Sequence, residues 1–381
     1  MMHLIENENF NLNQLKKNTL FSSKGYQDIV EFHKSLGNKE TPLVKLTGLA
    51  KYLGIGDILL KDESHRFGLD AFKALGASYA MQKEIFKSPQ IKYFCTATDG
   101  NHGRAVAWMA KKLEREAYIY MPKETIAARI LEVEKEGANV ILTDENYDVT
   151  VKLAKKCVDT GNKRSKEQYW SLVQDTAWLG YEKIPIDIMR GYFTQAYEIT
   201  KQIGQEKVDI LFLQTGVGSW AASIIMYILE QWNHSPFFIG VEPNSANCLF
   251  ESIKTGSRLS VDNSKKTTMA GLNCGSISTV AWQILKNTII GSISIPDRLA
   301  ENAMKVLANP LPKDPIVVSG ESGASGLGAL IGLCETENFK KFKEKIHLNS
   351  LSKVLVISTE GATDSLNYKR VVSDNSGNQE I

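Results

Sequence analysis

A lysine in an apolar setting is the first residue of this 381-residue chain whose type and position suggest chemistry. Lys73 falls in the first turn of an expected helix, among the small and apolar residues of segment 72–76. Burial in an apolar pocket lowers the pKa of a lysine, and a lysine that forms a Schiff base requires this. Taken alone, a surface lysine with its stem along apolar surface is the more ordinary interpretation.

A second segment, 96–103, contains polar side chains between an apolar run and a helix. The amide of Asn101 could hydrogen-bond a phenolate oxygen, and its glycine neighbours would let the backbone approach a ligand closely. Asp99 could act on a substrate, but a carboxylate before a helix is equally a plain N-terminal cap. His102 by itself indicates a packed histidine more than an acid–base group.

A third segment follows a strongly apolar run and leads into a helix. Backbone N–H groups of such a Gly-rich turn form a site for phosphate. The residues concerned are Gly216, Val217, Gly218 and Ser219. A dinucleotide-binding turn is the alternative, but Ala221 stands where that pattern requires its third glycine. Later in the chain, the hydroxyl of Ser358, or less favourably of Thr359, could meet the ring nitrogen of a ligand, although a capped turn would also explain that segment.

Short apolar runs alternate with stretches of helical length, which predicts an α/β fold with mostly parallel sheets and helices on both faces. Ligands of such sheets bind at the carboxyl ends of the strands, where the three segments fall. Stretch 155–168 is expected to be a helix end and a solvated loop, and the tail 373–381 to be frayed. The expected strands are 58–60, 92–97, 117–121, 139–143, 169–173, 209–214, 237–242, 316–319 and 353–358, and the clearest helices are 71–86, 103–113 and 220–232.

The composition is that of an ordinary enzyme and excludes several other classes. The net charge of +2 gives no electrostatic argument for a nucleic-acid or anionic-membrane partner. No apolar run approaches the length that spans a bilayer, and the N-terminus lacks the pattern of a secretory signal. Five scattered cysteines indicate reduced thiols in the cytoplasm, and the dispersed histidines predict no metal site. The length favours two domains.

In their order and spacing, these segments resemble the fold-type II, tryptophan-synthase-β-like pyridoxal-phosphate enzymes, and within them the 2,3-diaminopropionate ammonia-lyases. The similarity extends over roughly residues 40–370. The Asp of TDGNHGR is discriminating, because threonine dehydratases carry a serine at that position. The matching motifs are KDES-RFGL-AFK (61–73), TDGNHGR (98–104), VQDTAW-GY (173–181), MAGL-CG (269–275), SGESGA-GLG (319–328) and ISTEG-TD (357–364).

The resemblance implies a cofactor, pyridoxal 5′-phosphate, between a large domain (1–90 and 208–381) and a small domain (91–207). It implies that Lys73 forms the Schiff base beside Phe72 and that Asn101 holds the phenolic oxygen of the cofactor. The loop 216–219 would bind the phosphate, and Ser358 or Thr359 would face the pyridine nitrogen.

The implied activity is that of a carbon–nitrogen lyase, the α,β-elimination of D- or L-2,3-diaminopropionate to pyruvate and two ammonia. Lys73, Asp99 and Asp175 would be catalytic, with the two carboxylates flanking the substrate. A dehydratase-like lyase for serine, threonine or another β-substituted amino acid, or a non-catalytic relative, are the alternatives. A cytoplasmic homodimer with a small amino-acid substrate is expected from the resemblance.

Two departures from the family pattern stand out. Ser276-Ile277-Ser278 replaces the usual Glu-Pro-Asn, which could alter substrate choice or rate. Asp70 replaces a more usual Asn and could raise the pKa of the neighbouring Schiff base. Cys248 and Cys274 occupy positions where related chains also have cysteines, and a disulfide between them is disfavoured in a reducing cytosol.

Overall fold

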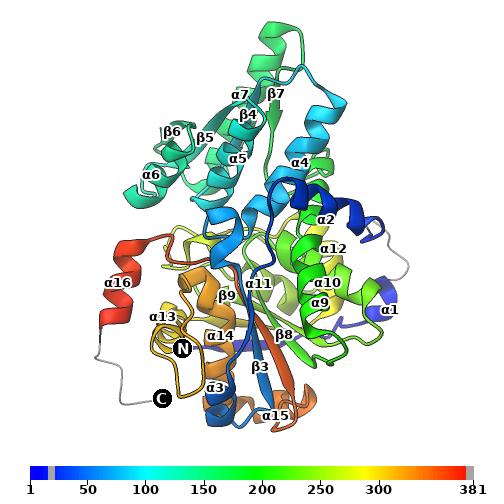
Figure 1. The fold of residues 1–381 in the computed structure, drawn as a ribbon, viewed down its shortest axis with the longest axis vertical. Coiled ribbons are helices and arrows are strands. Elements are labelled where there is room, and N and C mark those ends of the chain that lie inside the picture. Colours follow the sequence, from blue (N-terminus) through cyan, green and yellow to red (C-terminus); the bar gives the residue numbers. More distant parts are fainter. Residues whose placement is uncertain (16–21, 375–381) are drawn as a thin grey trace.

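The computed structural model describes residues 1–15 and 22–374, and their strands form two sheets in different parts of the molecule (Figure 1). The larger sheet has seven strands, and its inner pairs are parallel while the two edge pairs are antiparallel. In spatial order it consists of β1 (His3–Glu6), β10 (Ile289–Ile295), β9 (Phe237–Pro243), β8 (Ile210–Gln214), β11 (Lys353–Ser358), β3 (Asp57–Asp62) and β2 (Leu43–Lys45).

The smaller sheet has four strands, all parallel. In spatial order it consists of β6 (Asn139–Thr143), β5 (Glu116–Pro122), β4 (Tyr93–Ala97) and β7 (Trp170–Leu172). The predicted fold, two mostly parallel sheets in an α/β arrangement, is confirmed. The smaller sheet uses only strands between residues 91 and 207, and the larger sheet only strands outside that range.

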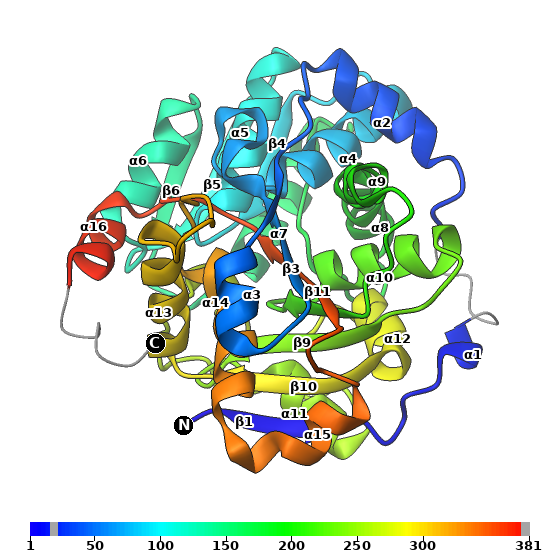
Figure 2. The same cartoon turned by 60° about the horizontal axis from the view of Figure 1, so that its bottom comes forward.

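Both faces of the larger sheet are buried, as the continuous apolar runs predict. On β11, Leu355 and Ile357 belong to one apolar cluster, whereas Val354 and Val356 belong to another on the opposite face. Successive side chains of a strand point to opposite faces, so a strand covered twice must be apolar throughout. Helices α9, α10 and α12 lie on one face and α3, α13 and α14 on the other (Figure 2).

The helices have the following bounds: α1 (Leu12–Leu15), α2 (Tyr26–Ser35), α3 (Thr47–Leu53), α4 (Lys73–Lys87), α5 (Asn101–Lys112), α6 (Ala127–Lys135), α7 (Tyr147–Ser165), α8 (Lys183–Gly191), α9 (Phe193–Ile203), α10 (Ser219–Gln231), α11 (Cys248–Thr255), α12 (Thr279–Thr288), α13 (Asp297–Ala308), α14 (Glu321–Glu335), α15 (Lys340–Lys345) and α16 (Ser365–Ser373). The three predicted helices correspond to α4, α5 and α10. In the described part of the chain, no helix is long and apolar enough to cross a membrane.

Three sequence predictions differ from the structure. Residues 316–319 are irregular rather than a strand, because the segment joins neither sheet: Val317 and Ser319 are buried, whereas Ile316 is 71% exposed and Val318 40% exposed. Strand β10 was missed and is fully buried between β9 and β1. Helix α7 continues to Ser165 through the expected loop, since its Val151, Ala154 and Val158 pack on the smaller sheet. Most of the predicted frayed tail, residues 375–381, lies outside the described residues.

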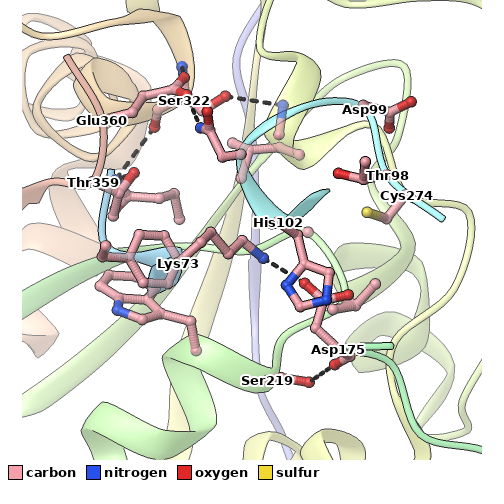
Figure 3. A pocket seen from close by; sticks show the side chains of 18 of the residues that line it. Lys73, Thr98, Asp99, His102, Asp175, Ser219, Cys274, Ser322, Thr359 and Glu360 are labelled. Atoms are coloured by element: carbon pink, nitrogen blue, oxygen red, sulfur yellow. Dashed lines mark hydrogen bonds and ion pairs between the residues drawn. The ribbon is translucent and has the colours of Figure 1, made fainter. Parts of the chain in front are cut away.

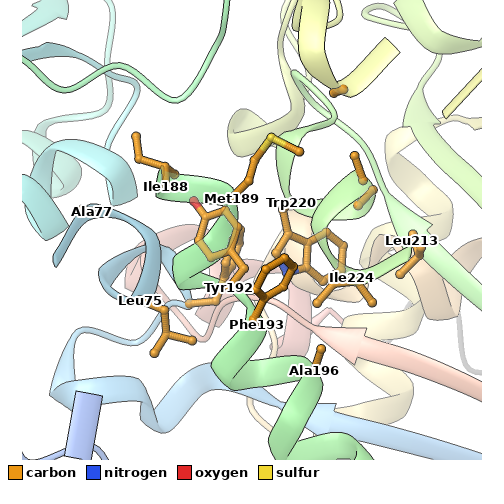
Figure 4. Close-up of a cluster of buried hydrophobic side chains, with 14 of the residues drawn as sticks. Leu75, Ala77, Ile188, Met189, Tyr192, Phe193, Ala196, Leu213, Trp220 and Ile224 are labelled. Atoms are coloured by element: carbon orange, nitrogen blue, oxygen red, sulfur yellow. The ribbon is translucent and has the colours of Figure 1, made fainter. Parts of the chain in front are cut away.

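Helix α4, which begins at Lys73, is held by apolar packing against helices from both sides of the molecule. Figure 4 shows Leu75 of α4 close to Tyr192 and Phe193, with Trp220 and Ile224 of α10 behind them. Helices α4 and α8 approach so closely that a Cβ added to Gly191 would lie 2.3 Å from the carbonyl oxygen of Leu75. This contact fixes the start of α4, and with it the backbone of Lys73.

Helix α9, which falls within the range expected for the small domain, packs on α2 and α10. The expected domain bounds, with residues 91–207 as the small domain, stay a prediction.

Replacing Gly191 by Ala tests this close helix contact. The added methyl group meets backbone atoms that cannot rotate away, so we expect a loss of about 1–3 kcal/mol in the free energy of unfolding. Gly332→Ala is the matched control, because its Cβ would meet the flexible ends of Leu299 and Met2 at 3.0 and 3.1 Å. Denaturant unfolding of both variants measures the difference, and equal stability of the two would contradict the assignment.

Candidate active site

A cavity opens at the carboxyl ends of β8, β11 and β4, between the two sheets. This is the place that the strand pattern predicts for a ligand. Its walls bring together ten of the eleven predicted site residues, from segments far apart in the sequence. These are Phe72, Lys73, Asp99, Asn101, Asp175, Gly216, Val217, Gly218, Ser219 and Thr359.

The loop before Lys73 is held by a buried network of charges. Arg66 is fully buried, and its guanidinium donates hydrogen bonds to Glu63 and Glu198 at 2.7–2.8 Å. Lys61 at the end of β3 donates to the same Glu198 at 3.0 Å. Charged partners that satisfy one another in the interior lock the geometry of the segment that carries them. The turn from β3 to α4 therefore has one arrangement, despite the positive φ of Phe67.

Lys73 reaches into the cavity and pairs with Asp175. Its Nζ donates to Asp175 Oδ2 at 2.5 Å, with the lysine side chain 20% exposed and the aspartate 6% (Figure 3). Burial lowers the pKa of Lys73, but the Asp175 charge and hydrogen bond outweigh it and raise this pKa above its ordinary value. The prediction of a lowered pKa is therefore wrong for the paired amine, because the sequence does not reveal the countercharge.

The pKa of Asp175 moves in the opposite direction. Burial alone would raise the pKa of Asp175, but the neighbouring Lys73 ammonium lowers this pKa by more, to about 2. Its backbone carbonyl accepts a hydrogen bond from Ser219 Oγ at 2.7 Å, which joins the segment after β7 to the Gly-rich loop.

Asp99 is the second carboxylate of the cavity and has a different environment. Burial raises its pKa to about 7, while Arg129 and Lys266 act in the opposite sense and Asp175 raises it further. Figure 3 shows Asp99 well separated from the Lys73 amine. Two aspartates with pKa values near 2 and 7 can perform different proton-transfer roles at neutral pH.

The Gly-rich loop presents unused backbone donors. The N–H groups of Gly216, Val217 and Gly218 have no acceptor among the described residues. Gly218 has φ +82°, a conformation that favours glycine, and a Cβ there would lie 2.8 Å from Leu285. The loop precedes the N-terminus of α10, where a helix favours negative charge. Together these features fit a phosphate group.

Ser358 is the one predicted site residue that does not line the cavity. Its hydroxyl donates to Ser319 Oγ at 2.7 Å, on the far side of the strand end. Thr359, the next residue, points into the cavity and accepts a hydrogen bond from Gln214 Nε2 at 3.1 Å. Thr359 comes directly after the last residue of β11 and, like its neighbour Glu360, lines the cavity. Of the two predicted hydroxyls, only that of Thr359 lies in the cavity wall, and which of them meets a ring nitrogen stays a prediction.

Sequence reasoning missed Glu360, which lines the cavity and is 1% exposed. Its carboxylate accepts hydrogen bonds from Asn101 Nδ2 at 2.5 Å, from the Ser322 backbone N–H at 3.1 Å and from Thr363 Oγ1 at 3.2 Å. Asn101, expected to hold a phenolic oxygen, is therefore oriented by Glu360. The motif ISTEG-TD contains this glutamate, but the motif does not show toward which side of the strand end its side chain points.

Two further polar groups face the cavity with atoms that lack partners in the described structure. His102 donates from Nε2 to the carbonyl of Val173 at 2.7 Å, which leaves Nδ1 as an unpaired acceptor. Burial lowers the pKa of His102. The hydroxyl of Tyr192 is also buried and unpaired. His102 falls inside TDGNHGR, whereas Tyr192 has no local sequence signal.

The departures noted in the sequence lie behind the cavity wall. Ser278 accepts a hydrogen bond from the Ala177 N–H at 3.0 Å and donates its own N–H to Val217 O at 2.9 Å. It braces the Gly-rich loop and does not line the cavity. Asp70 is half-exposed and its carboxylate lies 3.7 Å from Arg104, so it is directed away from Lys73. Cys248 and Cys274 are free thiols, and Cys274 lines the cavity.

The cavity as a whole fits pyridoxal phosphate: a lysine amine, a phosphate cradle of unused N–H groups, and a threonine hydroxyl at the opposite wall. Glu360 holds the Asn101 side chain between them. Among the described residues, no group of three His, Cys, Asp or Glu side chains could hold a metal ion.

Comparison with known proteins agrees with this arrangement. The profile of the family "Pyridoxal-phosphate dependent enzyme" matches residues 34–360. Diaminopropionate ammonia-lyase of Escherichia coli K12 is 40% identical over 93% of this chain and 92% of its own length. That of Salmonella typhimurium is 38% identical over 97% and 98%. The crystal structure of the Escherichia coli enzyme with an aminoacrylate-PLP azomethine intermediate has a TM-score of 0.90, at 38% identity over 98% of this chain and 97% of that one.

Asp175→Asn tests the ion pair. Without the countercharge, burial alone acts on Lys73, so its pKa should fall and more of the amine should be neutral at pH 7. We expect the apoprotein of the variant to capture pyridoxal phosphate faster than the unaltered apoprotein, while turnover falls by roughly 100-fold or more. Stopped-flow absorbance and steady-state rates measure the two effects. Asp187→Asn, which removes a buried carboxylate of α8 outside the cavity, is the control and should change neither.

Proposed function

The chain belongs to the pyridoxal-phosphate-dependent enzymes and, within them, to the diaminopropionate ammonia-lyases, and from this premise we propose that it converts 2,3-diaminopropionate to pyruvate and two ammonia. It is thus a carbon–nitrogen lyase. The observation that carries the choice of substrate is the placement of two differently tuned carboxylates, Asp99 and Asp175, in the cavity that contains the Lys73 amine.

Each part of the cofactor has a partner in this cavity. The N–H groups of the loop from Gly216 to Ser219 would bind the phosphate, and Asn101, oriented by Glu360, would donate to the phenolic oxygen. Thr359 would place its hydroxyl at the ring nitrogen. A neutral hydroxyl there leaves the ring without a full positive charge, which suits elimination. When bound, pyridoxal phosphate supplies an electron sink for the negative charge left at the substrate Cα.

Lys73 and Asp175 act together as the proton relay on one side of the substrate. The Lys73 amine, when it is not bound to the cofactor, would accept the Cα proton. Asp175, with a pKa near 2, stays ionised and stabilises the ammonium that results. The hydrogen bond from Ser219 to the Asp175 backbone holds this carboxylate in position.

Asp99 serves the other side. The β-amine leaves only when protonated, because free amide is a poor leaving group. The Asp99 carboxylate attracts a substrate ammonium, and with a pKa of about 7 it can also accept a Cα proton and return one. Two bases at separate positions would allow both enantiomers to react.

A dehydratase-like lyase for serine or threonine is the alternative function. The hydroxyl of these substrates gives Asp99 no cation to attract.

We also propose a cytoplasmic homodimer. The family resemblance supports the dimer, and the five free thiols fit a reducing compartment. Light scattering in solution would give twice the mass of one chain.

Pyruvate release from D- and L-2,3-diaminopropionate and from serine, measured side by side, tests the substrate. We expect kcat/KM for at least one diaminopropionate enantiomer to exceed that for serine by about 100-fold or more, since a site that pairs a substrate polar group discriminates strongly against its absence. Lys73→Ala should abolish both activities and the visible absorbance of the bound cofactor. A preference for serine would contradict the proposal, and full activity of Lys73→Ala would exclude the cofactor chemistry.

Asp99→Asn tests the two-base arrangement. A base with a pKa near 7 works when ionised, so kcat/KM for the enantiomer that depends on Asp99 should rise as the pH increases through about 7. In the variant this rise should disappear, and turnover of that enantiomer should fall by roughly 100-fold or more while the other is much less affected. Equal losses for both enantiomers would refute the assignment.

A further inference from the structure

A second cavity adjoins the active site and shares Asp99, Arg129 and Tyr147 with it. One wall of this outer cavity is formed by the segments that follow β5 and β6 of the smaller sheet, and the other by residues between 263 and 273. Because Asp99 lines both cavities, a ligand in the outer cavity can reach this residue.

Arg129, in the first turn of α6, lies at the junction of the two cavities and lacks a partner. It is 4% exposed, and within the described ranges no hydrogen bond or ion pair involves its guanidinium; Nε is fully buried and unpaired. The side-chain stem packs on Gly100, where a Cβ would come within 3.2 Å of Arg129 Cδ. Arg129 lowers the pKa of Asp99 and of Glu321 by its charge, but neither carboxylate lies at ion-pair distance.

A buried guanidinium without a countercharge is unfavourable. Its planar donors match a carboxylate in a bidentate manner. The position therefore calls for an anion that residues 1–15 and 22–374 do not provide.

Two more residues of the outer cavity carry buried polar atoms without partners: Thr125 Oγ1 and Asn273 Oδ1. The Thr125 hydroxyl can donate to a carboxylate, and the Asn273 amide oxygen can accept from an ammonium. Asp99 adds a negative charge at the inner end. The site thus offers donors and acceptors of both kinds, which suits a small zwitterion better than a simple anion such as phosphate.

We propose that the outer cavity is a binding site for the free α-amino acid, with its carboxylate on Arg129 and Thr125 and its ammonium groups toward Asn273 and Asp99. The substrate occupies this site before it moves inward to Lys73. The identity of the ligand as 2,3-diaminopropionate rests on the proposed function, whereas the recognition of a carboxylate by Arg129 rests on the outer cavity alone.

Binding to the borohydride-reduced holoenzyme isolates this site, because the reduced cofactor stays fixed on Lys73 and cannot take up the substrate amine. Isothermal titration calorimetry compares 2,3-diaminopropionate with 1,2-diaminoethane, which lacks the carboxylate. We expect diaminopropionate to bind at least about tenfold more tightly, the effect of one charged hydrogen-bonded pair. Absence of binding, or equal binding of both compounds, would overturn the proposal without any variant.

Arg129→Gln should weaken diaminopropionate binding to the reduced enzyme by about tenfold or more. Arg164→Gln, at an exposed position of α7, should leave it unchanged. In the active enzyme we expect kcat/KM of Arg129→Gln to fall by a similar factor, mainly through KM, with partial rescue by Arg129→Lys. Unchanged binding in Arg129→Gln, or a loss confined to kcat, would refute the role of Arg129.

The two proposals fail in different experiments. If the unaltered enzyme releases no pyruvate from diaminopropionate, the proposed function falls. Calorimetry with the reduced enzyme then still decides on the outer site, with serine as the carboxylate-bearing ligand and 2-aminoethanol as its counterpart. Tighter binding of serine supports the site, and equal binding overturns it.

Discussion

The buried charges around Arg66 are the constraint on which the rest of the site depends. Arg66 and Lys61 both donate to Glu198 of α9, and Arg66 also donates to Glu63, so the end of β3 is tied to a helix more than 130 positions later. Removing one member would leave a buried charge without a partner, which is strongly destabilising. The network therefore allows one path for the turn from β3 to α4. Lys73 stands at the end of that path, where α4 is further held by its close contact with α8.

The proposed chemistry depends on how the surroundings shift the pKa values of two carboxylates of the same residue type. Asp175 and Asp99 are the same residue type, yet one has a pKa near 2 and the other near 7. The difference has a physical cause: Asp175 has the Lys73 ammonium at 2.5 Å, whereas Asp99 is desolvated without an equally close cation. Such divergence is how a site holds a permanent anion and an acid–base group side by side.

Segments that follow strands of both sheets form the cavity walls, and hydrogen bonds connect the segments of one sheet with those of the other. Ser219 donates to the backbone of Asp175, and Ser278 connects Ala177 with Val217, so the Gly-rich loop and the segment after β7 support each other. In the unusual Ser276–Ser278 segment, Ser278 thus braces the Gly-rich loop. Arg129 occupies the junction of the two cavities, and no described residue accepts a hydrogen bond from its guanidinium.

The sequence by itself determined the fold class, the cofactor and most of the cavity wall. Strand and helix periodicity is local, and the segments that follow parallel strands gather at one edge of a sheet, so Lys73, Asn101 and residues 216–219 could be predicted to line one cavity. Only the tertiary structure decided that Thr359 and not Ser358 faces the cavity, that Glu360 orients Asn101, and that Asp175 raises the pKa of Lys73. It also decided that Arg129 is buried without a partner. The direction, burial and pKa of a side chain depend on neighbours that the fold brings from distant segments, and no local pattern records them.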